Sequence, residues 1–126
     1  MRILYYLLIL LTFALPWGCT ESPIPLSCKQ RLAKSQESIT DVHKKYLSCA
    51  IDKDCVLVSF STTCQGACQQ AVNLQGEPFV KAAVQNANNT WCQHYQADKC
   101  GYSTPKCASP VAKCVNKKCQ TQVITP

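Results

Sequence analysis

The sequence lacks the short motifs that mark common classes of small enzyme. It has no C-x-x-C pair, which thiol oxidoreductases use to lower the pKa of one thiol. It also has no G-x-S-x-G and no H-E-x-x-H, the local signatures of α/β-hydrolases and zinc proteases. These absences favour a protein that is not an enzyme and that uses no cofactor.

Histidine and acidic residues are also scarce. Only His43 and His94 could act as a general base or join cysteines around zinc, and the seven acidic residues are spread along the chain. Each histidine is a candidate for a small catalytic site, although a structural or surface role explains it as well. The cysteines are widely spaced, which argues against a zinc site. We therefore predict no catalytic residue and no metal ligand.

A dense basic face is missing, which argues against nucleic-acid binding. The net charge is +6, and the best basic cluster is Lys113, Lys117 and Lys118. Three lysines near a turn are usually a solvated edge. We expect no nucleic acid among the partners.

Asn88-Asn89-Thr90 matches the N-glycosylation sequon, which matters only in an exported eukaryotic protein.

Residues 3–17 form an apolar run without a charge, preceded by Arg2. As a helix this run spans roughly 22 Å, short of the roughly 30 Å hydrocarbon core of a bilayer. It is therefore predicted to be a signal peptide, over residues 1–18, rather than a permanent membrane span. Near its end there is no pair of small residues one and three positions before a cut, which an ordinary signal peptidase requires.

Gly18 and Cys19 directly follow the apolar run, and this junction resembles the lipobox of bacterial lipoproteins. In that family the cysteine is diacylated and becomes the mature N-terminus. The family usually has Leu three places before the cysteine and a small residue two places before it, where this chain has Pro16 and Trp17. The resemblance covers the leader alone and implies a lipid on Cys19. Thr20 stands where inner-membrane lipoproteins usually carry Asp, which implies anchoring at the outer membrane, facing the periplasm or the surface.

The cysteine count supports a lipid on Cys19 independently of the motif. The chain has eleven cysteines, an odd number, and a lipidated Cys19 leaves ten for five bridges. This density is typical of exported domains that disulfides stabilise. The predicted half-cystines are Cys28, Cys49, Cys55, Cys64, Cys68, Cys92, Cys100, Cys107, Cys114 and Cys119. Their pairing stays open at this point.

The rest of the chain divides into a short tether, residues 19–27, and a disulfide-rich domain, residues 28–126. A helix is expected from Cys28 to Cys49, with Ser27 as its N-cap, because apolar and cysteine side chains recur at intervals of three and four. Its inward stripe is Cys28, Leu32, Ser35, Ile39, Val42, Tyr46 and Cys49.

Further along, Cys55 to Phe60 is rich in apolar and β-branched residues and predicts a strand. A brief helical turn is expected over residues 69–74. A second helix is expected from Pro78 to about Trp91, with Phe79 on its buried face. Residues 111–115 and 118–123 predict a hairpin around residues 116–117. The expected fold class is α+β, with two helices packed on a small antiparallel sheet.

Loops fixed at their ends by cysteines are the best candidate contact regions, because they bind with little ordering cost. These are Ser59 to Gln65, Gln96 to Pro105 and Val115 to Lys118. We expect an envelope lipoprotein whose domain binds a protein partner, as an inhibitor or immunity-type protein. Two alternatives remain open: a secreted eukaryotic disulfide-rich protein with Cys19 paired between chains, and a small envelope enzyme that uses His43 and His94.

Overall fold

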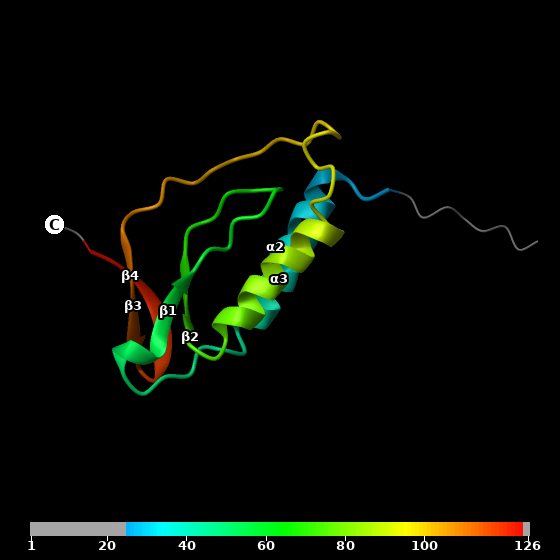
Figure 1. Cartoon of the computed structure of the whole chain (residues 1–126). Coiled ribbons are helices and arrows are strands. Elements are labelled where there is room, and N and C mark those ends of the chain that lie inside the picture. The colour runs from blue at the N-terminus through cyan, green and yellow to red at the C-terminus, as the bar shows by residue number, and fades with distance from the viewer. Residues whose placement is uncertain (1–24, 125–126) are drawn as a thin grey trace, which may run out of the picture.

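The computed structural model describes residues 25–124, where two helices pack beside two antiparallel hairpins (Figure 1). The leader and Cys19 lie outside the described residues. The elements are α2 (Cys28–His43), the 3-10 helix η1 (Asp52–Asp54), β1 (Cys55–Val58), β2 (Gln70–Asn73), α3 (Glu77–Thr90), β3 (Pro110–Val115) and β4 (Lys118–Val123). The fold is the predicted small disulfide-rich α+β type, with two two-stranded sheets in place of one. Over residues 25–124, no helix combines the length and the apolar character that a membrane crossing requires.

Helix α2 begins where the sequence predicts, because its first residues form a capping box. The Ser27 hydroxyl accepts a hydrogen bond from the backbone N–H of Gln30 at 3.3 Å. The Gln30 side chain in turn accepts from the backbone N–H of Ser27 at 2.9 Å. Two amides that would otherwise be unsatisfied at the helix start are thereby bonded.

The same helix ends at His43, earlier than the predicted end at Cys49. The segment that follows is bonded to the C-terminal hairpin instead. The carbonyl of Leu47 accepts from the N–H of Cys119 at 2.6 Å, and the N–H of Cys49 donates to the carbonyl of Lys117 at 3.2 Å. These long-range bonds replace the helical ones, which the local periodicity could not reveal.

The main apolar core lies between the two helices and the first hairpin. Its buried side chains are Ile39, Val58, Val72, Val80 and Ala87. Helix α3 starts one residue before the predicted Pro78, and this proline lies in the first turn, where its missing N–H does little harm. The helix lies alongside α2 (Figure 1).

Two local predictions around this core are wrong. Residues 69–74 contain strand β2 rather than a helical turn, because Ala71 and Val72 are buried and β2 pairs with β1. Phe79 was expected on the buried face of the second helix, yet 54% of it is exposed. Its ring stacks on the ring of Tyr46, with centroids 5.0 Å apart. Tyr46 covers only part of the Phe79 ring, and the rest of the ring is exposed to solvent.

The C-terminal hairpin has the predicted turn. Asn116 and Lys117 have φ values of 51° and 59°, and this left-handed conformation is what a two-residue hairpin turn with the right twist requires. Cys114 and Cys119 face each other across β3 and β4. The hairpin contacts the first one through the N–H of Ala71, which donates to the Thr121 hydroxyl at 2.8 Å.

All ten predicted half-cystines form disulfides. The sequence left their pairing open, and the structure gives it. The five bridges are Cys28–Cys100, Cys49–Cys114, Cys55–Cys119, Cys64–Cys92 and Cys68–Cys107. Their sequence separations run from 28 to 72 residues, so each one joins distant parts of the chain. Long closed loops of this kind raise stability mainly by restricting the unfolded chain, by about 3–5 kcal/mol each in the chain-entropy account.

Candidate functional site: a groove between helix α2 and a clamped loop

The two histidines that could have formed a catalytic site have other partners. His43 bonds the carbonyl of Ala71 through Nε2 at 2.8 Å, and its ring meets the edge of Phe60 with centroids 5.0 Å apart. His94 is exposed and has a φ of 58°, in the turn after α3. Within residues 25–124 neither histidine bonds a carboxylate, so no base is paired there with an orienting acid.

Two of the acidic residues stabilise turns. The pKa of Asp52 is lowered, first because its carboxylate accepts a hydrogen bond from the Lys113 ammonium at 2.8 Å and then because it accepts one from the N–H of Cys114. The pKa of Asp54 is lowered by the N–H groups of Ala50 and Ile51, which both donate to it. Both carboxylates are therefore held in the ionised form by structural contacts.

The loop that follows β1 is the first of the predicted contact regions, and its own hydrogen bonds shape it. The hydroxyl of Thr62 accepts from the N–H groups of Cys64 and Gln65, each at 3.3 Å. Thr62 itself is 8% exposed. The hydroxyl of Ser61 both donates to the carbonyl of Ala67 and accepts from its N–H, each at 3.0 Å. The loop is thus folded on itself.

Covalent and polar contacts then fix this loop to its surroundings. Cys64 is bonded to Cys92, just after α3, and Cys68 is bonded to Cys107. The Thr63 N–H donates to the side chain of Asn88 on α3 at 2.8 Å. In Figure 1 the loop reaches from the first hairpin toward the helices. Its position relative to α2 is therefore set before any partner arrives.

A groove of about 280 Å³ lies between this loop and α2. Helix α2 supplies one wall and the loop supplies the other. The lining residues are Leu32, Ser35, Gln36, Ile39, Thr40, Phe60, Thr62, Gln65 and Ala67. At the rim, the side-chain amide of Gln36 donates to the side-chain carbonyl of Gln65 at 2.6 Å, which links the two walls. The sequence predicted the loop wall but not the helix wall, because Leu32 was expected on the inward stripe of the helix. Ser35 and Ile39 are buried, as that stripe predicts.

The chemistry of the groove is neutral. Its accessible apolar surface comes from Leu32 and Phe60, since Ile39 is buried, and its polar atoms are hydroxyls and amides. None of the lining residues is charged. Such a groove can receive an apolar side chain and exchange hydrogen bonds with uncharged backbone groups, whereas an isolated charge would lose its hydration there without compensation.

The other two predicted contact regions lie in different places. The N–H of Gly66 donates to the carbonyl of Ser103 at 2.9 Å, so residues 96–105 extend beside the loop of residues 59–67. A Cβ on Gly66 would lie 3.0 Å from a side-chain atom of Thr104, which shows how closely the two segments pack. The hairpin tip, residues 115–118, lies at the far end of the molecule in Figure 1. Only the first two regions form one continuous surface.

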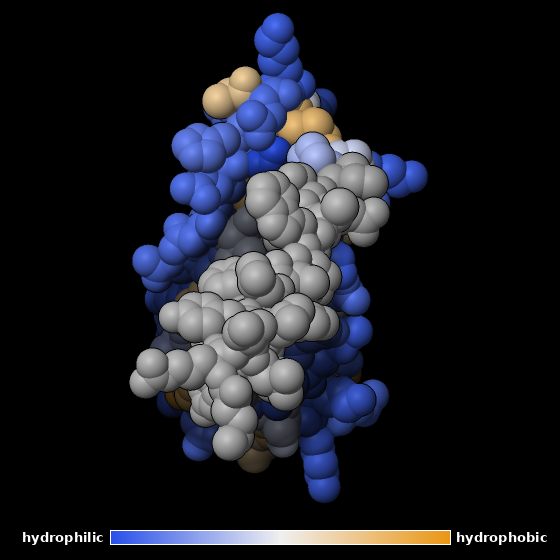
Figure 2. Space-filling model, turned by 90° about the vertical axis from the view of Figure 1, so that its right-hand side faces the viewer, coloured by the Kyte–Doolittle hydropathy of each residue, from blue (hydrophilic) through white to orange (hydrophobic). Residues whose placement is uncertain are grey.

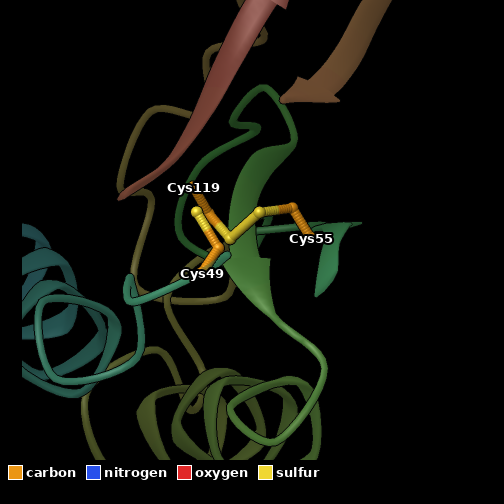
Figure 3. A group of neighbouring side chains, drawn as sticks. All are labelled: Cys49, Cys55 and Cys119. Atoms are coloured by element: carbon orange, nitrogen blue, oxygen red, sulfur yellow. A yellow bond between two sulfur atoms is a disulfide. The ribbon is translucent and has the colours of Figure 1, made fainter. Parts of the chain in front are cut away.

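Figure 2 shows one face of the molecule, part of which can be seen. Where that face is visible it is mostly hydrophilic, with small hydrophobic areas near its ends. Three cysteine sulfurs lie close enough together to be considered as a metal site: the Sγ atoms of Cys49, Cys55 and Cys119 are within 4.8 Å of one another (Figure 3). All three are in disulfides, and zinc binds thiolates rather than disulfide sulfur.

Comparison with protein-family models, with curated proteins and with solved structures found no match for this chain.

Proposed function

We propose that this chain is an exported lipoprotein whose disulfide-stabilised domain binds a protein partner without catalysis, as an inhibitor or immunity-type protein. The observation that carries the proposal is the uncharged groove between α2 and the loop of residues 59–67, both walls of which are fixed in place. A binding surface that is already ordered avoids most of the entropy loss that a mobile loop suffers on binding.

The size and lining of the groove indicate which part of a partner would enter it. A volume of about 280 Å³ is just below the usual range for small-molecule sites, and it suits one bulky side chain rather than a cofactor. Leu32 and Phe60 would contact this side chain, while Gln36 and Gln65 would bond the partner backbone beside it. We expect a neutral segment with a single Leu, Ile, Met or Phe at its centre.

The contacts of His43, a candidate catalytic residue, and of two acidic residues support a role without catalysis. His43 is bonded to Ala71, and Asp52 and Asp54 bond backbone amides of turns. None of these three residues lines the groove. A hydrolytic site would need a nucleophile and a base at one place, and the groove contains hydroxyls without a base.

The place of action follows from the leader. A lipid on Cys19 would hold the domain at the outer membrane, and the short tether before α2 would keep the groove close to the bilayer. Partners that reach it would then be envelope proteins or proteins delivered to the envelope. An oxidising compartment also allows the five bridges to persist.

A peptide-display selection tests the groove directly. Random neutral and charged peptides would be selected on the folded domain, and each enriched peptide would then be tested for binding to an Ala67→Leu variant, in which the added side chain fills the groove. We expect enriched peptides with one bulky apolar residue between uncharged ones. The matched control is Ala33→Leu, at an exposed position of α2 outside the groove. Enrichment of charged peptides, or of peptides that A67L binds as well, would contradict the proposal.

A further inference from the structure

Two of the five disulfides meet at one place, where they join the C-terminal hairpin to the rest of the domain. Cys49–Cys114 and Cys55–Cys119 each connect the segment around η1 to the β3–β4 hairpin. The sulfur atoms of Cys49, Cys55 and Cys119 lie within 4.8 Å of one another (Figure 3). We name Cys49, Cys55, Cys114 and Cys119 the latch cysteines.

The two bridges differ in exposure. Cys55 and Cys119 are 8% and 4% exposed, and they belong to a small buried cluster with Ala71. Cys49 and Cys114 are only partly buried, at the edge of that cluster. A thiol from solution can therefore reach Cys49–Cys114 more easily than Cys55–Cys119.

A second pairing of the same cysteines is available without large movement. Cys114 and Cys119 stand directly opposite each other in β3 and β4, with both side chains on one face of the hairpin. Such positions are close enough for a disulfide. The Sγ atoms of Cys49 and Cys55 are also neighbours. The alternative pairs are thus Cys49–Cys55 and Cys114–Cys119.

We propose that the latch cysteines are a thiol-responsive site, at which a small thiol of the glutathione class converts the two long-range bridges into two local ones. The inference does not rest on the proposed binding function, because no latch cysteine lines the groove.

The exchange proceeds in three balanced steps. The external thiolate attacks Sγ of Cys114, forms a mixed disulfide there and releases Cys49 as a thiolate. The Cys49 thiolate attacks Sγ of Cys55, forms Cys49–Cys55 and releases Cys119 as a thiolate. The Cys119 thiolate attacks the mixed disulfide at Cys114, forms Cys114–Cys119 and returns the external thiolate. Two disulfides exist before and after, so no oxidant or reductant is consumed.

The consequence is the release of the hairpin. After exchange, only Cys68–Cys107 would still join the C-terminal part of the chain covalently to the first hairpin region. The contacts left at the latch would be noncovalent: the Lys113–Asp52 ion pair, the bond between Cys119 and Leu47, and the packing of Ala71 with Leu57 and Ala112. Exposed ion pairs contribute little stability and the apolar cluster is small, so loss of both long-range bridges would let the hairpin open more readily.

The experiment maps the bridges of the mature protein after incubation with a small amount of glutathione at about pH 8, near the ordinary thiol pKa. Free thiols are blocked with N-ethylmaleimide, and trypsin cuts at Lys53 and Lys117, which separate the two cysteines of each local pair. We expect Cys49–Cys55 and Cys114–Cys119 to appear together. Unchanged native pairing, or the pairs Cys49–Cys119 and Cys55–Cys114, would overturn the proposal.

A rate comparison tests the order of the steps. When Cys49→Ser and Cys114→Ser remove the Cys49–Cys114 bridge, opening of Cys55–Cys119 by glutathione should slow by at least about tenfold, because the attacking thiolate is no longer intramolecular. Removal of the Cys68–Cys107 bridge, in which Cys107 is exposed, by Cys68→Ser and Cys107→Ser is the matched control and should leave that rate unchanged. Equal rates in all three proteins would overturn the proposed route.

A single substitution supplies a readout that does not depend on the double variant. Cys114→Ser leaves Cys49 without its partner beside the buried bridge. We expect alkylation to label Cys49 in some molecules and Cys119 in others, since the free thiol can pass between them by one exchange. Labelling of Cys49 alone would contradict the proposal.

Discussion

Gly76 lies so close to Tyr46 that a Cβ added to the glycine would be 2.2 Å from the Cβ of the tyrosine and 2.6 Å from its Cγ. This contact brings the start of α3 against the segment that follows α2. The chain can approach so closely there only because Gly76 has no side chain.

Gly76→Ala is therefore expected to lower the free energy of unfolding by about 1–3 kcal/mol, the usual penalty for overpacking. The neighbouring atoms belong to the Tyr46 stem and to Val72, which is fully buried, so they cannot easily move away. Urea denaturation with the disulfides intact measures the change. Gly101→Ala is the matched control, because nothing lies within 4 Å of its added Cβ. Equal stability of the two variants would contradict the packing described above.

The pKa of Asp52 should respond to Lys113. Its carboxyl is expected to titrate below its usual 3.8, and Lys113→Met should raise that midpoint because it removes the largest cause of the lowered pKa. Asp54 is an internal control, since its pKa is lowered by the N–H groups of Ala50 and Ile51. Carbon NMR of the carboxyl groups measures both. An unchanged midpoint for Asp52 would show that the ion pair does not form in solution.

The sign of the pH dependence follows from the direction of this pKa. A carboxyl with a lower pKa in the folded state stabilises the fold above its unfolded pKa, and that stability is lost as the pH falls through the folded pKa. Wild type should therefore lose hairpin stability on acidification below about pH 4, and Asp52→Asn should lose less over the same range. A variant with the same acid sensitivity as wild type would rule out this contribution.

Loss of the Cys64–Cys92 bridge should loosen the groove loop selectively. With Cys64→Ala and Cys92→Ala, amides of residues 59–67 should exchange with solvent faster, because the bridge holds the loop against the end of α3. Amides of β3 and β4 should keep most of their protection, since other bridges hold that hairpin. Hydrogen exchange followed by mass spectrometry separates the two regions. Equal loosening of both would mean that the bridge stabilises the domain only as a whole.

The lipid anchor can be tested by mass spectrometry of the mature protein. We expect an N-terminal Cys19 that carries a diacylglycerol group, and no thiol that reacts with an alkylating agent before reduction. Cys19→Ser should release the protein from the membrane fraction. An intact leader, or a disulfide at Cys19, would contradict the assignment and favour the secreted alternative.

Local signals in the sequence predicted the elements that local interactions determine. The capping box at Ser27 and Gln30 needs only neighbouring residues, as does the left-handed turn at Asn116 and Lys117. Strand β2 was missed because its conformation depends on pairing with β1, from which the loop of residues 59–67 separates it in the sequence. Long-range partners of this kind leave no mark in the local periodicity of the chain.

The same reasoning explains how far the groove could be predicted. The loop that forms one wall follows a predicted strand and is flanked by Cys64 and Cys68, so its position at the surface was predictable. The helix wall was not predicted, because Leu32 has the spacing of a core residue and only the tertiary structure leaves it partly exposed. The five disulfide pairs likewise depend on the whole fold.

Binding at the groove is measured by the dissociation constant of a selected neutral peptide for wild type, Ala67→Leu and Ala33→Leu. Burial of one large apolar side chain contributes about 1.5–3 kcal/mol, so filling the groove should weaken binding roughly 10- to 100-fold. We expect this loss for A67L and a wild-type value for A33L. Equal binding by all three proteins would show that the partner binds elsewhere and would contradict the proposed groove site.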